Sequence, residues 1–127
     1  MFKILVIDKR ETIHSAVKYL LYRYNLDFCR DAEEALSMLN REIYDLILIS
    51  VPLDYKTSEE YDGLMEWTTK KKTIAMADSV SKECIEEAQF FGVTVCIDKL
   101  NICRLPELVE MHLNKAVTKV MERVEVE

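Results

Sequence analysis

The stretch Tyr44-Asp45-Leu46-Ile47-Leu48-Ile49-Ser50 decides the fold of this chain. Four consecutive apolar residues between polar ones are typical of a central β-strand that is covered on both faces. A second stretch of this kind, Ile4-Leu5-Val6-Ile7, lies between Lys3 and Asp8. Strands buried on both faces are characteristic of parallel sheets whose strands are connected by helices. The two stretches therefore predict an α/β protein.

Outward from these strands, short apolar runs alternate with segments in which apolar residues recur at helical spacing. Strands are predicted at residues 3–8, 26–30, 44–50, 73–77 and 93–97. Helices are predicted at 12–24, from 32 onward after a cap at Asp31, at 64–71, at 81–91 and from 105 to about 121. Glu34 stands in capping-box spacing to Asp31, and Gly92 is placed to end its helix in a left-handed conformation.

This alternation predicts a five-stranded parallel sheet with helices on both faces. Residues 1–127 are predicted to form a single domain, whose last few residues are an extended helix end or a tail. The apolar stripe of the last predicted helix continues through Val120, Met121 and Val124, beyond the part that the sheet is expected to cover. This leaves apolar surface for a partner or for dimerisation.

Composition excludes several classes of protein. The formal net charge of -6 disfavours nucleic acid or an anionic membrane as the main partner. The apolar start of the chain stops at Asp8, too early for a secretion signal or a membrane span, so a cytoplasmic protein is expected. No metal-site spacing links the cysteines, which are predicted to be reduced and mostly buried: Cys29, Cys84, Cys96 and Cys103.

In open parallel sheets, functional sites lie beyond the carboxyl ends of the strands, near the point where the strand order reverses. The residues that the predicted strands bring to this edge are Asp8, Ser50, Ala77, Asp98 and Lys99. They are the candidates for a functional site on the architecture alone.

Several short motifs follow each other along the chain in an order that resembles the receiver domains of two-component response regulators. These motifs are Ile4–Asp8, Ala35-Leu36, Asp45–Ile49, Asp62-Gly63, Phe91-Gly92-Val93 and Asp98-Lys99. The resemblance covers residues 3 to about 118. It implies the (βα)5, flavodoxin-like fold and a role in signal transduction.

The family's chemistry depends on two adjacent carboxylates after the first strand and on a phosphoacceptor aspartate after the third, which together hold Mg²⁺. The resemblance places Asp8 and Lys9 at the positions of the paired carboxylates, and Ser50 at the position of the acceptor. One carboxylate beside a lysine is a poor Mg²⁺ site, and a serine hydroxyl does not accept a phosphoryl group without activation.

The other positions of the family's site are only partly kept. The resemblance places Ala77, followed by Asp78, where the family has a Ser or Thr, and Cys96 where it has an aromatic switch residue. Lys99 matches the family's lysine. We therefore interpret the chain as a degenerate pseudo-receiver that is not an enzyme, has no cofactor, and binds Mg²⁺ weakly or not at all.

The individual residues leave alternatives open. Asp8 and Lys99 are expected to form an ion pair, to which Lys9 could contribute, either as a locked switch or as a structural pair. Ser50 could act as a nucleophile only with Asp8 as its base. The acids of the loop after Ser50 are either solvated or a relocated cation site: Asp54, Glu59, Glu60 and Asp62. Tyr61 and Trp67 are either a binding anchor or helix packing.

The expected function is that of a phosphorylation-independent signalling module. Its partner is expected to be another signalling protein, bound through the face of the fourth helix, fifth strand and fifth helix that receiver domains commonly use. Two alternatives are an atypical receiver with Mg²⁺-dependent switching and a small-ligand-binding, flavodoxin-like module. The second is disfavoured because no Gly-rich or Ser/Thr-rich phosphate cradle follows the strands. The sequence leaves the partner, the pathway and the oligomeric state open.

Overall fold

The computed structural model describes residues 2–79, 81–93, 95–114 and 125–126. Its sheet is parallel throughout and has the strand order β2-β1-β3-β4-β5-β6. The five predicted strands are confirmed. They are β1 (Lys3–Ile7), β2 (Asn25–Cys29), β3 (Leu46–Val51), β4 (Thr73–Ala77) and β5 (Val95–Asp98).

A short sixth strand, β6 (Glu125–Val126), was not predicted, because two residues are too few for a sequence pattern. It pairs in parallel with β5, with Val95 opposite Glu125 and Cys96 opposite Val126. The other residues of the predicted helix end or tail, 115–124 and 127, lie outside the described residues. The prediction that Val120, Met121 and Val124 extend an apolar stripe falls on that part of the chain.

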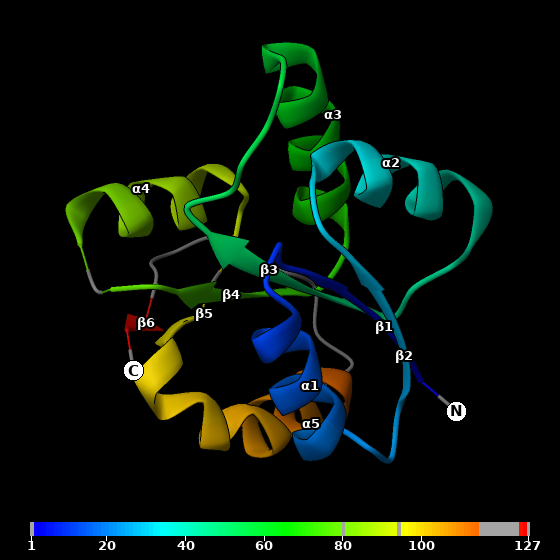
Figure 1. Cartoon of the computed structure of the whole chain (residues 1–127), viewed down its shortest axis with the longest axis vertical. Coiled ribbons are helices and arrows are strands. Elements are labelled where there is room, and N and C mark those ends of the chain that lie inside the picture. Colours follow the sequence, from blue (N-terminus) through cyan, green and yellow to red (C-terminus); the bar gives the residue numbers. More distant parts are fainter. Residues whose placement is uncertain (1, 80, 94, 115–124, 127) are drawn as a thin grey trace.

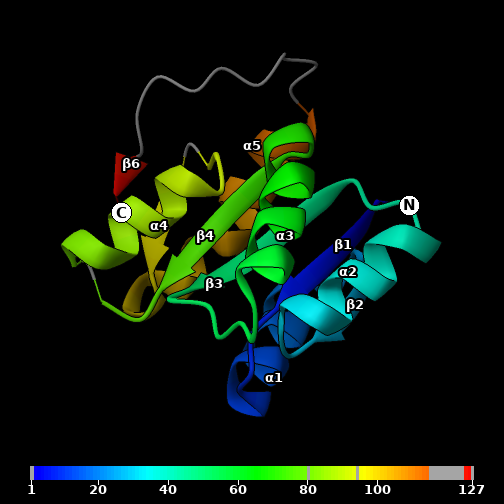
Figure 2. The ribbon, with the colours of Figure 1, turned by 90° about the horizontal axis from the view of Figure 1, so that it is seen from above.

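Helices cover both faces of the sheet, as predicted (Figures 1 and 2). One face carries α1 (Glu11–Leu20) and α5 (Leu105–Asn114), and the other carries α2 (Ala32–Arg41), α3 (Ser58–Lys70) and α4 (Lys82–Phe90). A 3-10 segment, η1 (Lys99–Arg104), connects β5 to α5. Each helix layer packs its own hydrophobic core against the sheet. β3 and β4 are buried along their whole length and contribute side chains to both cores.

The predicted helix ends are partly wrong. α1 ends at Leu20 rather than at Tyr24, because the chain turns there and the Tyr24 N–H donates to the Leu21 carbonyl at 3.0 Å. Leu21, which follows the helix at its C-cap, is only 1% exposed and packs into the core from this turn. The caps are confirmed: Asp31 accepts the Glu34 N–H at 2.9 Å, and Gly92 has a φ of 74°.

The third helix begins earlier than predicted. α3 starts at Ser58, where Thr57 caps it and accepts the Glu60 N–H at 3.1 Å, so part of the predicted acidic loop is helical. Glycine lowers helix propensity, so Gly63 concealed this start. In the fold, a Cβ at Gly63 would lie 3.4 Å from the Leu36 methyl groups, so the glycine lets α3 approach α2 closely.

The cysteines are free thiols: Cys29, Cys84 and Cys96 are buried, and Cys103 is exposed. Trp67 is partly buried against the core between α2, α3 and the sheet, which favours its reading as packing. Across the described residues, every helix is too short or too polar to cross a membrane.

Candidate functional site

The carboxyl ends of the central strands place four of the site's residues. The strand order reverses between β1 and β3, so Asp8 and Ser50 lie at the switch point. Backbone hydrogen bonds extend the sheet by one residue beyond β1 and β4. The Asp8 N–H donates to the Cys29 carbonyl at 3.1 Å, and the Asp78 N–H donates to the Val51 carbonyl at 3.2 Å. Lys99 starts η1, directly after β5.

Asp8 is the centre of the site and is only 2% exposed. Its Oδ2 accepts a hydrogen bond from the Ser50 hydroxyl and lies 3.0 Å from Lys99 Nζ. Its Oδ1 accepts the backbone N–H of Arg10 at 2.8 Å. The predicted Asp8–Lys99 ion pair is therefore confirmed, and Ser50 is bound to the same carboxylate.

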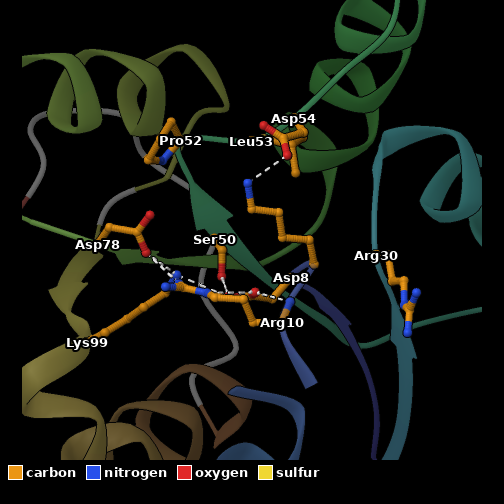
Figure 3. A pocket seen from close by; sticks show the side chains of 10 residues that line it. Asp8, Arg10, Arg30, Ser50, Pro52, Leu53, Asp54, Asp78 and Lys99 are labelled. Atoms are coloured by element: carbon orange, nitrogen blue, oxygen red, sulfur yellow. Dashed lines mark hydrogen bonds and ion pairs between the residues drawn. The ribbon is translucent and has the colours of Figure 1, made fainter. Parts of the chain in front are cut away.

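Arg10 and Asp78, which were not predicted to take part in the ion pair, complete the charge arrangement. Arg10 Nε lies 3.4 Å from Asp8 Oδ1, and Arg10 Nη2 lies 2.5 Å from Asp78 Oδ1. Lys99 Nζ is also 2.6 Å from Asp78 Oδ1. Asp8, Arg10, Asp78 and Lys99 thus alternate in sign around a closed, neutral ring, which we call the charge ring (Figure 3).

The charge ring determines the protonation of both carboxylates. Burial acts to raise the pKa of Asp8, but the hydrogen bonds from Ser50 and from the Arg10 N–H, together with Lys99, outweigh it and lower that pKa. Burial also opposes ionisation of Asp78, and Lys99 and Arg10 overcome it, so the pKa of Asp78 is lowered as well. Both groups are carboxylates at neutral pH. A carboxylate with a lowered pKa is a weak general base, so Asp8 is poorly suited to activate Ser50.

Lys9 does not join the charge ring. Its Nζ lies 2.8 Å from Asp54 Oδ2, and both side chains are mostly exposed. Arg30 also lies apart from the ring, on the β2 side (Figure 3), and pairs with Glu11 at 2.9 Å. Lys9, which was considered as a possible contributor to the Asp8 ion pair, does not contribute to it, and Arg10 does.

Ala77 and Cys96 lie where the predicted strands place them. Ala77 is the last residue of β4, and it brings a buried methyl group to this edge. Cys96 lies in the middle of β5 and is 1% exposed. Burial raises the pKa of the Cys96 thiol to about 11, so the thiol is protonated and packs as an apolar side chain.

A cavity of about 20 Å³ opens onto the charge ring. It is lined by the ring, by Ser50 and by the loop residues Pro52, Leu53 and Asp54, and Lys9 and Arg30 also border it. A cavity of this volume holds about one water molecule. It is too small for an organic ligand.

Of the two alternatives for the acids after Ser50, a relocated cation site with Asp8 is not supported. Asp54 pairs with Lys9, whereas Glu59, Glu60 and Asp62 lie on α3. Within the described ranges, no three His, Cys, Asp or Glu side chains meet in a geometry that could hold a metal ion. His14 lies on α1, and its Nε2 is 2.6 Å from the Asp8 carbonyl oxygen, so it contacts the backbone of the site from the α1 side of the sheet.

The sequence held a signal for each overlooked residue. Asp78 directly follows a strand, as Asp8 does, and charged residues at strand ends converge in a parallel sheet. Arg10 stands two residues after Asp8, which is the spacing of an aspartate that binds a following backbone N–H in a turn. The spacing alone does not fix where the long Arg10 side chain points.

The sequence matches no protein-family model and none of the curated proteins. Its structure is similar to solved receiver domains. A CheY-like response regulator receiver domain protein from Methanospirillum hungatei superposes with a TM-score of 0.75 at 22% identity, covering 90% of this chain and 94% of that chain. The response regulator TrrA from Thermotoga maritima, solved in complex with Mg²⁺-BeF, superposes with a TM-score of 0.72 at 22% identity, covering 89% of this chain and 100% of that chain. The receiver domain of a Francisella response regulator superposes with a TM-score of 0.73 at 22% identity, covering 89% of this chain and 97% of that chain. The chain has the fold of CheY-like receiver domains.

Proposed function

We propose that this chain is a receiver-like signalling module that acts through protein–protein interaction and without phosphorylation. The observation that carries the proposal is the charge ring. At the edge of the sheet where receiver domains hold Mg²⁺ and the phosphoryl group, the Arg10 guanidinium and the Lys99 ammonium already neutralise Asp8 and Asp78.

The residues present do not fit a Mg²⁺ ion. Mg²⁺ requires an octahedral set of oxygen ligands, and proteins usually supply one or two carboxylates with water. Asp8 and Asp78 are the carboxylates of the ring, and each is bound to both cations. A divalent ion would have to displace Lys99 from Asp8 or lie beside two positive charges, which Coulomb repulsion opposes.

The acceptor position argues in the same direction. The Ser50 hydroxyl donates a hydrogen bond to Asp8, a carboxylate with a lowered pKa. The neighbouring position that would hold a phosphoryl oxygen in the family carries the Ala77 methyl group. The acceptor position is therefore not activated, and the position of the family's Ser or Thr has no hydroxyl to bind a phosphoryl oxygen. Both features disfavour the atypical phospho-responsive receiver. The volume of about 20 Å³ disfavours a small organic ligand in the cavity at the charge ring.

For the docking surface we propose the face formed by α4, β5 and α5, which receiver domains commonly use. In this chain β6 pairs with β5 along that face, so the partner would contact α4 and α5 beside β6 rather than an open β5 edge. One exposed apolar side chain of α5 supports this choice: Met111 is 44% exposed. Leu100, which is 89% exposed, lies next to the face in η1, the segment that connects β5 to α5. Exposed aliphatic side chains of this kind are suited to a protein partner, either another signalling protein or a second copy of this chain.

The proposal predicts that phosphodonors leave the protein unchanged. After incubation with Mg²⁺ and acetyl phosphate, intact-mass spectrometry is expected to show no added phosphoryl group. Amide spectra with Mg²⁺ and beryllofluoride are expected to show no saturable shifts at Asp8, Ser50 or Lys99. A mass gain, or saturable shifts at these residues, would contradict the proposal and restore a phosphorylation switch. The TrrA receiver, whose structure contains Mg²⁺-BeF, is the positive control.

A further inference from the structure

Three aromatic rings form a partly exposed row along α3, α4 and the loop between β3 and α3. The ring centroid of Tyr61 lies 4.4 Å from that of Tyr55 and 4.6 Å from that of Phe90. Tyr61 also contacts the fully buried Phe91 at 4.8 Å, which attaches the row to the core. Tyr55 and Phe90 remain 50% and 40% exposed. We call Tyr55, Tyr61 and Phe90 the aromatic row.

Glu87 of α4 holds the row in place through two hydrogen bonds. One carboxylate oxygen of Glu87 accepts the Tyr61 hydroxyl at 3.0 Å, and the other accepts the Leu53 N–H at 2.8 Å. This one side chain therefore ties α4 to α3 and to the loop after β3. A surface whose rings are fixed before binding loses less conformational entropy when a partner binds. The aromatic row is preorganised in this sense.

The two segments that carry the row are acidic, although Lys9 and Arg30 lie near Tyr55 and Lys9 pairs with Asp54 at 2.8 Å. Residues 54–62 and 82–90, which carry the row, contain seven carboxylates and two lysines. Both lysines are already engaged: Lys56 pairs with Glu33 at 3.4 Å, and Lys82 pairs with Glu86 at 3.9 Å. On α4, Glu86 stands one helical turn before Phe90 and therefore lies beside it on the helix surface. Exposed aromatic rings thus lie next to excess negative charge.

We propose that the aromatic row binds a cationic segment of a partner protein, whose arginine side chains stack on Tyr55 and Phe90 and pair with carboxylates of α3 and α4. A guanidinium group suits this surface better than an ammonium group, because it is planar, weakly hydrated, and able to stack on a ring while donating to a carboxylate. Tyrosine and arginine are also the residues most enriched in binding hot spots.

Charge decides against other occupants. Nucleic acid and anionic lipid would be repelled by the carboxylates around the row. An uncharged apolar partner would have to desolvate the same carboxylates without compensating them, which costs free energy. The row lies on the α3 side of α4, so it is a second surface beside the α4–β5–α5 face. The inference does not depend on the proposed absence of phosphorylation.

The test uses the whole chain and a fluorescein-labelled peptide of twelve residues. In this peptide every second residue is serine, and the residues between the serines are arginine and leucine in turn. Fluorescence anisotropy is expected to show saturable binding that weakens with added salt, as exposed charge pairs do. The same peptide with lysine in place of arginine is expected to bind more weakly, and the peptide with glutamate is not expected to bind. Equal binding of the arginine and glutamate peptides would overturn the proposal.

Ring removal locates the binding surface. The double variant Tyr55→Ala/Phe90→Ala is expected to weaken binding of the arginine peptide about tenfold, since it removes two exposed cation–π contacts together with the apolar contact of the two rings. The matched control is Tyr19→Ala on α1, on the opposite face of the sheet, where the ring is 81% exposed. Circular dichroism is used to check that each variant is folded.

Two outcomes of the ring removal would refute the assignment. The first is unchanged affinity in Tyr55→Ala/Phe90→Ala, and the second is an equal loss in Tyr19→Ala. If the double variant unfolds, amide shifts of the native protein on titration with the arginine peptide replace it. Shifts confined to residues 53–62 and 82–91 support the proposal, and shifts elsewhere refute it.

Discussion

Replacing Asp8 by asparagine is expected to lower the free energy of unfolding by about 3 kcal/mol, because it removes the one fully buried carboxylate of the charge ring. Lys99, whose side chain is only 10% exposed, would keep its ion pair with Asp78 but lose the ion pair with Asp8, whose Oδ2 lies 3.0 Å from Lys99 Nζ. Arg10 would lose its contact with Asp8 Oδ1 in the same way. Urea unfolding at neutral pH measures the change.

The sign of this effect separates the charge ring from a site crowded with carboxylates. Where several carboxylates converge without cations, removal of one relieves repulsion and stabilises the fold. In the charge ring each carboxylate is already compensated, so removal leaves excess positive charge. Unchanged or increased stability of Asp8→Asn would contradict the arrangement. Asp54→Asn is the matched control, because Asp54 pairs with Lys9 on the surface and such pairs contribute about 0–1 kcal/mol.

The pH dependence of the same variant follows from the lowered pKa of Asp8. A carboxyl whose pKa is lower in the folded than in the unfolded chain, where it is about 3.9, stabilises the fold above that value. Its contribution is lost as the pH falls through the folded-state pKa. The native protein and Asp8→Asn are therefore expected to differ most at neutral pH and to converge in acid. A constant difference across this range would show that Asp8 does not stabilise the fold through its charge.

The second large effect is expected when a carboxylate site is rebuilt. The triple variant Lys9→Asp/Arg10→Ser/Ser50→Asp brings two more carboxylates to the carboxyl ends of β1 and β3 and removes the guanidinium between Asp8 and Asp78. Carboxylates gathered at one site attract Mg²⁺ and repel each other without it. We expect Mg²⁺ to stabilise this variant, by about 1.4 kcal/mol at ten times the dissociation constant. The native chain is expected to gain nothing.

The control for the rebuilt site is Ser50→Asp alone. It restores the acceptor carboxylate of the family but keeps Arg10 and Lys99 on Asp8 and Asp78. Urea unfolding with and without Mg²⁺ compares the three proteins. If Ser50→Asp gains as much from Mg²⁺ as the triple variant does, Arg10 is not what blocks the metal. If the triple variant gains nothing, the sheet edge no longer has the geometry of a metal site.

The sequence predicted the architecture because burial on both faces leaves a direct mark on it. The continuous apolar runs of β1 and β3 and the helical spacing between them required a parallel sheet with two helix layers, and the structure has both. Element ends were harder to predict, because they depend on single residues. Gly63 weakened the helix signal of α3, although its contact with Leu36 is what lets α3 pack closely on α2.

The sequence by itself determined which residues reach the carboxyl edge of the sheet, because the apolar pattern marks the strand ends and the carboxyl ends of parallel strands lie at one edge. Asp8, Ser50 and Lys99 were placed there correctly, and Ser50 and Lys99 both contact Asp8. Only the tertiary structure decided how their charges are compensated. Arg10 turns inward to Asp8 and Asp78, while Lys9, one residue earlier, turns outward to Asp54. The physical reason is that long, flexible side chains choose their partners by distance and burial in the folded protein, and sequence spacing fixes neither.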